Sequence, residues 1–94
     1  MNRILENRRS DITRIANAHG AHRVRVFGSV AREEDRADSD LDLLIDLEAG
    51  RSILDLIAIK QDLEDLLGRN VDVVTEAAIS PYFRDEVVRE AVSL

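Results

Sequence analysis

The sequence predicts a small α/β fold in which helices alternate with three short strands. Two apolar runs, Leu41-Asp42-Leu43-Leu44-Ile45 and Val71-Asp72-Val73-Val74, are each interrupted by one acid and have the length and composition of buried strands. Between them, apolar residues recur at helical spacing. A chain of 94 residues makes one domain, residues 1–94, which can bury roughly 60–65% of its unfolded surface.

The first part of the chain predicts a helix, a strand and a short second helix. Apolar residues at helical spacing place the first helix at residues 3–18. Residues 23–27 form the first strand, in which Arg23 and Arg25 alternate with valines and are expected to face solvent. The short helix begins after Ser29 and leads into an acidic loop that runs through Asp38.

The second part predicts two longer helices around the third strand. Ser52 and Asp55 have the spacing of a capping box, and the helix that they begin ends at Gly68. Ser80 as the N-cap and Pro81 at the first helical position begin the last helix. The expected apolar face of the earlier helix comprises Ile53, Leu56, Ile57, Leu63 and Leu67. The residues expected to pack from the last helix are Tyr82, Phe83, Val87, Val88 and Ala91.

Charge and composition limit the classes of function. A formal net charge of -6, with one tyrosine and two phenylalanines, argues against a protein that mainly binds nucleic acid, because such domains carry a basic patch. No apolar stretch approaches the ~20 residues that cross a membrane, and no signal peptide is evident. The absence of cysteine excludes disulfides and thiol catalysis, which fits a cytoplasmic protein.

Three aspartates are the candidate metal ligands. Side chains alternate between the faces of a strand, so Asp40 and Asp42 should project to one side with their Cα atoms about 7 Å apart. If the strand that carries Asp72 lies beside them, three close anions need a cation or protons. Mg²⁺ is the natural occupant, because it prefers hard oxygen ligands and is usually completed by substrate phosphates. The pattern therefore predicts nucleotidyl transfer, in which one ion activates the attacking oxygen and another stabilises the leaving pyrophosphate.

A candidate phosphate site lies where the first strand turns into the short helix. Gly28 allows the backbone to approach a ligand closely, the helix N-terminus offers free N–H groups, and Ser29 adds a hydroxyl. Arg32, one turn further on, is within reach of a phosphate or of an acid of the cluster. The sequence leaves open an alternative for Arg32, a surface ion pair with Glu34, Asp35 or Asp38.

The motifs at residues 28–32, 39–44 and 71–74 resemble those of a known family. Gly28-Ser29, ten intervening residues and Asp40-Leu41-Asp42 resemble the signature of the DNA polymerase beta-like nucleotidyltransferase superfamily. The fuller wording over residues 24–75 is similar to its minimal nucleotidyltransferase branch: Gly28-Ser29-Val30-Ala31-Arg32, Ser39-Asp40-Leu41-Asp42-Leu43-Leu44 and Val71-Asp72-Val73-Val74. Glu33 departs from the pattern, since many relatives have glycine after the arginine, and this puts the local helix geometry in doubt.

The resemblance implies a fold, a site and an activity. The fold would be a two-layer nucleotidyltransferase fold, with a short mixed sheet of three to four strands packed with helices. Asp40, Asp42 and Asp72 would bind Mg²⁺, as two ions, and Gly28 and Ser29 would contact the phosphates of ATP. Similar small proteins are antitoxins whose partner is a HEPN-domain ribonuclease toxin. The resemblance thus implies AMP transfer from ATP to a tyrosine hydroxyl of that toxin, with Asp72 helping to deprotonate the hydroxyl.

Two other functions remain open. The first is a non-catalytic binding module that neutralises its partner by occlusion; the intact acids and phosphate turn favour the enzyme over it. The second is an antibiotic-modifying nucleotidyltransferase, which shares the signature but normally requires an additional substrate-binding domain. Apolar residues on the first or last helix could serve an oligomer or a partner. The base of the nucleotide and the acceptor are not specified by the sequence.

Overall fold

The computed structural model describes residues 3–34 and 39–94, so most of the predicted acidic loop, residues 35–38, lies outside the described part. The elements in chain order are α1 (Arg3–Ala18), β1 (Ala21–Phe27), α2 (Gly28–Ala31), β2 (Leu41–Leu47), α3 (Ile53–Leu67), β3 (Val71–Val74), the 3-10 helix η1 (Glu76–Ala78), α4 (Pro81–Glu90) and β4 (Val92–Ser93). The predicted bounds of the first helix and of the strand at residues 71–74 are confirmed.

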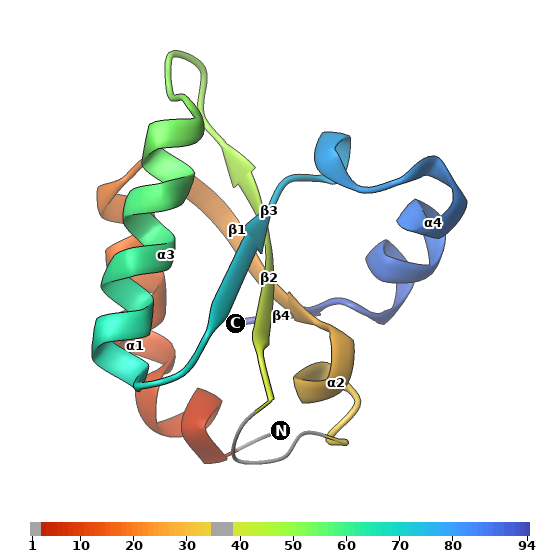
Figure 1. Cartoon of the computed structure of the whole chain (residues 1–94), viewed down its shortest axis with the longest axis horizontal. Helices are drawn as coiled ribbons and strands as arrows, with labels where there is room; N and C mark the ends of the chain where they lie inside the picture. Colours follow the sequence, from red (N-terminus) through yellow and green to blue (C-terminus); the bar gives the residue numbers. More distant parts are fainter. Residues whose placement is uncertain (1–2, 35–38) are drawn as a thin grey trace.

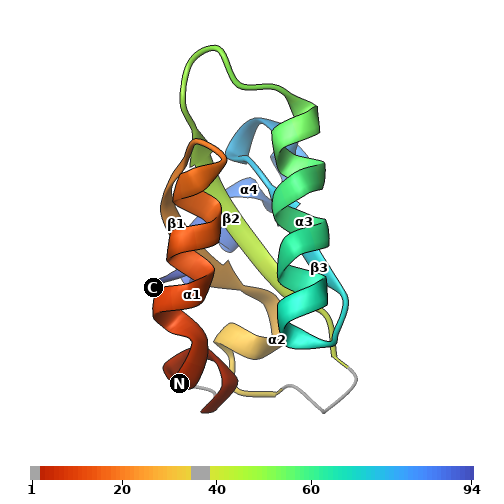
Figure 2. The same ribbon diagram turned by 90° about the vertical axis from the view of Figure 1, so that its left-hand side faces the viewer.

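The strands of the described residues form one four-stranded mixed sheet in the order β3-β2-β1-β4. β1 runs antiparallel to β2 and β4, whereas β2 and β3 are parallel and are connected through α3. Figure 1 shows α1 and α3 on one face of the sheet, with η1 and α4 on the other side. Figure 2 looks onto the helical layer and shows α1 and α3 side by side. The predicted α/β fold with a short mixed sheet packed with helices is confirmed.

The hydrophobic core lies between the sheet and the layer formed by α1 and α3. Alternate side chains of β1 and β2 point into it, because successive residues of a strand face opposite sides. Burying each large aliphatic side chain contributes roughly 1.5–3 kcal/mol. The buried residues of this core are Leu5, Ile12, Ala16, Ala21, Val24, Val26, Val30, Leu41, Leu43, Ile45, Ile59, Leu63 and Val71.

The helix ends follow the signals that the sequence provides. Ser52 and Asp55 form the predicted capping box. The hydroxyl of Ser52 accepts from the backbone N–H of Leu54 at 3.2 Å, and the carboxylate of Asp55 accepts from the backbone N–H of Ser52 at 3.0 Å. Gly68 ends α3 in the left-handed conformation with φ +67°. Ser80 caps α4, and Pro81 occupies its first turn. No helix in the described part of the chain combines the length and apolarity needed to cross a bilayer.

Arg25 corrects one prediction about the first strand. Its side chain alternates with the valines as expected, but only 3% of the residue is exposed. The second face of the sheet is not open to solvent there, because η1 lies close to it and supplies Glu76. The guanidinium of Arg25 donates to Oδ1 of Asp46 at 3.3 Å and to Oε1 of Glu76 at 3.2 Å. Arg23 is exposed as predicted and has φ +49° beside a bulge in β1.

Two helices expose side chains that were expected to pack. Tyr82 is 93% exposed, so its assignment as a packing residue was wrong, and Phe83 is 59% exposed. Ile53 and Ile57 of α3 are also exposed. The physical reason is that helical spacing identifies an apolar face, whereas its coverage depends on how far the neighbouring layer extends. The short edge strand β4 was not predicted, because two residues carry no periodicity.

Candidate active site

The candidate site forms at one end of the sheet. Asp42 in β2 is the register partner of Asp72 in β3 on one side and of Phe27 in β1 on the other. β1 ends at Phe27, so the next residue, Gly28, begins its turn beside the same carboxylate. Since register partners in a sheet project from the same face, the two carboxylates are neighbours. The structure thus brings together three of the predicted site residues from segments that are distant in the sequence.

The environment of Asp42 disfavours its ionised form. Partial burial, followed by the charges of Asp72 and Asp40, raises the pKa of Asp42 from 3.8 to about 6. A hydrogen bond with the carboxyl of Asp72 acts in the same direction, while the charge of Arg32 opposes it. A carboxyl pair of this kind carries excess negative potential near neutral pH. A divalent cation or a proton would relieve it.

Asp40 lies directly before β2, close to Asp42. It is exposed, and β2 begins at the next residue, Leu41. Within the described residues, no three acids or histidines are grouped so that they could hold a metal ion. Asp42 and Asp72 are neighbours, and Asp40 is close enough for its charge to act on Asp42. This set fits Mg²⁺, which is usually held by one or two carboxylates and completed by substrate phosphates.

Gly28 brings the backbone of the turn against the carboxylate of Asp42. Its φ of +75° lies in the left-handed region, and a β-carbon at this position would collide with Oδ2 of Asp42. The helix that follows, α2, comprises only Gly28–Ala31. Ser29 lies half-buried within this turn, where the sequence places it. The turn thus lies against the carboxylate of Asp42, and the helix behind it is a single turn.

Arg32 ends α2 and contacts two acids. Its Nε donates to Oε2 of Glu34 at 3.1 Å, and its Nη1 donates to both carboxylate oxygens of Glu90, at 3.2 and 3.1 Å. Of the alternatives that the sequence left open, the pair with Glu34 is present, while Asp35 and Asp38 lie outside the described residues.

Glu90, the last residue of α4, is a member of the site that sequence reasoning missed. In addition to its contact with Arg32, its Oε1 accepts a hydrogen bond from the backbone N–H of Gly28 at 2.9 Å. Glu90 is separated from Arg32 by 58 positions in the chain and from Gly28 by 62. No local pattern could have revealed it, because only the packing of α4 against α2 brings the residues together.

Lys60 of α3 contacts the start of β3. Its ammonium group donates to the carbonyl oxygen of Val71 at 2.8 Å and to Oε2 of Glu64 at 3.1 Å. Glu64 in turn accepts a hydrogen bond from the backbone N–H of Val71 at 3.0 Å. Lys60 also lies 3.9 Å from Oδ1 of Asp72. The two α3 side chains thus fix the start of β3 and place a cation beside one of the candidate ligands.

One known protein family matches most of this chain. The model of the family described as "Nucleotidyltransferase domain" matches residues 10–94. The chain belongs to this nucleotidyltransferase family. The match includes every residue of the candidate site, so the chemistry of the family, transfer of a nucleotidyl group, is assigned to this chain as well.

Two relatives indicate which members of the family this chain resembles. This nucleotidyltransferase is 43% identical over 76 residues to a candidate protein adenylyltransferase of Methanocaldococcus jannaschii, MJ0435, a match that covers 81% of the chain and 82% of the relative. It is 40% identical over 73 residues to the protein adenylyltransferase MntA of Thermococcus cleftensis, covering 78% and 74%. The resemblance to the minimal nucleotidyltransferases that the sequence indicates is confirmed.

Solved structures agree with this placement. A candidate minimal nucleotidyltransferase is 52% identical and superimposes with a TM-score of 0.86, covering 96% of this chain and 92% of the other. A toxin–antitoxin complex with AMP-PNP contains a chain that is 19% identical, with a TM-score of 0.76 over 89% of this nucleotidyltransferase and 69% of that chain. At this identity the second likeness establishes a common fold.

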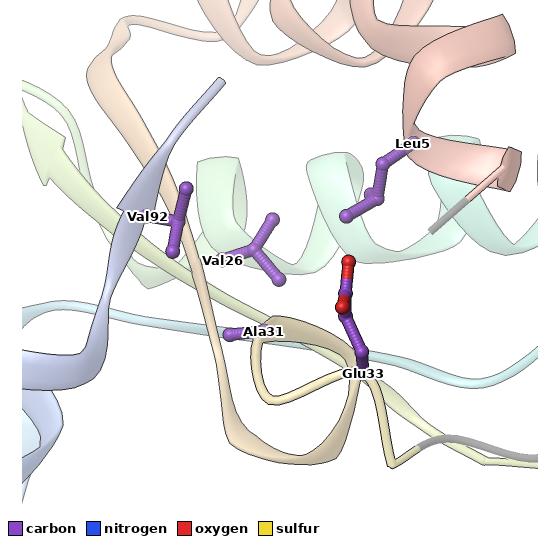
Figure 3. Close-up of a pocket in the computed structure, with 5 residues that line it drawn as sticks. All are labelled: Leu5, Val26, Ala31, Glu33 and Val92. Carbon is purple, nitrogen blue, oxygen red and sulfur yellow. The ribbon is translucent and has the colours of Figure 1, made fainter. Parts of the chain in front are cut away.

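A cavity of about 240 Å³ lies apart from the carboxylates, on the helical side of the sheet. Figure 3 shows the side chains that line it, with the carboxylate of Glu33 pointing toward Leu5; the others are Val26, Ala31 and Val92. None of the residues predicted to bind nucleotide or metal borders it. Glu33 has φ +60°, which lies in the left-handed region that favours glycine.

Proposed function

We propose that this nucleotidyltransferase is an antitoxin that transfers AMP from ATP to a tyrosine hydroxyl of a HEPN-domain toxin in the cytoplasm. The single observation that carries the proposal is the juxtaposition of Asp42 and Asp72 beside the turn at Gly28. A surface that acts only by contact has no physical need for two adjacent carboxylates, one with its pKa raised to about 6. The arrangement instead suits a reaction in which a metal and phosphates meet.

Each group has a role in the proposed reaction. The phenol oxygen of the tyrosine forms a bond to the α-phosphorus of ATP, the bond from that phosphorus to the bridging oxygen of the β-phosphate breaks, and pyrophosphate leaves. Exposed Asp72 takes the phenol proton. Gly28, Ser29 and Arg32 bind and orient the phosphates.

The metal requirement rests on the aspartates. Asp40, Asp42 and Asp72 would hold Mg²⁺, which when bound supplies a Lewis acid that neutralises developing negative charge. Asp40 lies directly before β2, and its charge already acts on Asp42.

The choice of acceptor draws on the relatives. MntA of Thermococcus cleftensis is a protein adenylyltransferase, and a structural neighbour is the toxin–antitoxin complex with AMP-PNP. The acidic surface also suits a protein acceptor better than a long nucleic acid, since the net charge is -6.

The test is intact-mass spectrometry of the protein encoded by the neighbouring gene after incubation with this nucleotidyltransferase, ATP and Mg²⁺. We expect the added mass of one or more AMP units. Asp42→Asn and Asp72→Asn should each slow the transfer at least about 100-fold, because several kcal/mol of charge stabilisation are lost. EDTA should abolish it. Asp65→Asn, an exposed carboxylate on α3, is the matched control and should transfer normally.

The same variants separate catalysis from occlusion. If Asp42→Asn binds and neutralises the partner as well as the unaltered protein does, and no AMP is transferred by either, the protein acts by contact. If binding persists while neutralisation and added mass are lost together, the chemistry is responsible. Transfer to another protein in the presence of ATP would retain the enzyme but replace the acceptor.

A further inference from the structure

Glu90 lies where the nucleotide phosphates are proposed to bind. Its Oε1 accepts the N–H of Gly28 at 2.9 Å, and both of its oxygens accept from Nη1 of Arg32, at 3.2 and 3.1 Å. Its side chain is 23% exposed. A backbone amide and a guanidinium are donors that proteins also use for phosphate oxygens, so the carboxylate satisfies groups that would otherwise be free for an anion.

A carboxylate and a phosphate cannot share these donors fully. The backbone of Gly28 has a single N–H, and its hydrogen bond to Glu90 directs that N–H away from any other acceptor. Arg32 already pairs with Glu34 through Nε and with Glu90 through Nη1, so a phosphate would be a third anion at one guanidinium and would be repelled by both. Entry of a phosphate therefore requires the carboxylate of Glu90 to move aside, and the two occupants compete for the same donors.

The backbone around Glu90 restricts how it can move. Glu90 ends α4, and after Ala91 the residues Val92 and Ser93 pair with Val26 and Arg25 of β1, the strand that leads into Gly28. Leu94 donates its N–H to the carbonyl oxygen of Val24 at 3.0 Å. The carboxylate is thus held close to the turn by α4, which precedes Glu90, and by the pairing of β4, which follows it. α4 itself has few contacts with the sheet and exposes Tyr82 and Phe83.

We propose that Glu90 is a positioning residue that competes with the nucleotide: it holds the Gly28 amide and Arg32 in place, and its carboxylate is displaced by a nucleotide phosphate. The inference rests on the proposed function, because it takes the phosphates to bind at Gly28 and Arg32. Nucleotide affinity is then set partly by the fraction of molecules in which Glu90 has moved aside. Binding is expected to loosen the end of α4 and the pairing of β4.

The test measures the dissociation constant of a non-hydrolysable ATP analogue with Mg²⁺ by calorimetry. Glu90→Gln keeps the size of the side chain but removes its charge, and should bind the analogue several-fold to about 10-fold more tightly, because the competing state is depopulated. Glu86→Gln, an exposed residue of the same helix, makes the same change of net charge and should bind as the unaltered protein does. Tighter binding is a result that a purely structural role would not give, since a loosened site binds more weakly.

Other outcomes would overturn the inference. If Glu90→Gln binds the analogue with unchanged or lower affinity while thermal unfolding shows an intact fold, Glu90 does not compete with the phosphate. If both glutamine variants tighten binding equally, general charge repulsion is the cause. AMP transfer by the unaltered protein tests the proposed function separately: if transfer is observed, that function stands even when the inference about Glu90 is contradicted. If neither the unaltered protein nor any variant binds the analogue, both the proposed function and the inference are contradicted. An amide shift of Gly28 in nuclear magnetic resonance spectra on adding the analogue provides the second measurement, and it should be reduced in Glu90→Gln.

Discussion

Gly28 and Asp42 lie so close that a β-carbon on residue 28 would collide with Oδ2 of the aspartate. Gly28 also has φ +75°, a backbone conformation that side chains with a β-carbon avoid. Steric access and backbone conformation thus both require glycine at this position. Because of this close approach, a phosphate bound at the turn and a metal bound by Asp42 would be neighbours.

Replacing Gly28 with alanine should therefore cost more than left-handed strain alone. We expect Gly28→Ala to lower the free energy of unfolding by about 2–4 kcal/mol, since the strain and the collision with Asp42 add. Gly50→Ala is the matched control, because Gly50 has φ +88° and no described atom lies within 4 Å of its β-carbon position. It should cost about 1 kcal/mol. Urea denaturation of both variants checks this, and equal losses would contradict the collision.

The raised pKa of Asp42 gives stability a distinct dependence on pH. Its folded-state pKa of about 6 exceeds the value of 3.8 expected for the unfolded chain, so the folded protein binds a proton that the unfolded chain releases between these values. Stability from this group is thus fully present below pH 4 and is lost as the pH rises through 6. Two units correspond to about 2.7 kcal/mol, but the side chain is only half-buried, so solvent screening reduces this to about 1 kcal/mol.

Asp42→Asn should remove that dependence. In EDTA at pH 7.5 we expect the variant to unfold with a free energy about 1 kcal/mol higher than that of the unaltered protein, and the difference should vanish near pH 4. The exposed Asp85→Asn on α4 should show no such trend. A variant less stable than the unaltered protein at pH 7.5 would mean that the environment of Asp42 does not disfavour its charge. A stable but inactive Asp42→Asn would also show that its loss of transfer is not unfolding.

Local signals explain which parts of the fold could be read from the sequence. The spacing of Ser52 and Asp55, and of Ser80 and Pro81, reports hydrogen bonds made within one helical turn, so α3 and α4 begin where predicted. The acid within each strand likewise indicated the pair Asp42 and Asp72, because burying an unpaired carboxylate is costly.

The remainder depends on contacts between distant segments. Glu90 reaches Gly28 across 62 positions, and Arg25 is buried because η1 happens to lie close to its face of the sheet. Alternation shows that Arg25 and the valines face opposite sides, but not which side is covered.

Arg25 offers a test of how a buried cation contributes. Its Nε is buried and makes no hydrogen bond with any described residue, which carries a cost of roughly 1–3 kcal/mol. Arg25→Met keeps the apolar bulk without that cost, so its stability should stay within about 1 kcal/mol of the unaltered protein. Arg25→Ala should lose about 2–4 kcal/mol, because it leaves a cavity beside Glu76 and Asp46. Thermal and urea unfolding distinguish the two, and equal losses would assign the stability to the ion pairs alone.

Glu33 provides a test of backbone strain next to the site. A non-glycine residue in the left-handed conformation costs roughly 1–2 kcal/mol, while glycine loses about 0.5–1 kcal/mol more in backbone entropy on folding. With φ +60° at Glu33, the strain exceeds the entropy, so Glu33→Gly should raise Tm by about 2–5 °C. Glu33→Gln has nearly the same backbone preference and removes only the charge, so its Tm reports the contacts of the side chain. If the glycine variant melts no higher than the glutamine variant, the left-handed turn after Arg32 stores no strain, and its departure from the family pattern has no thermodynamic cost.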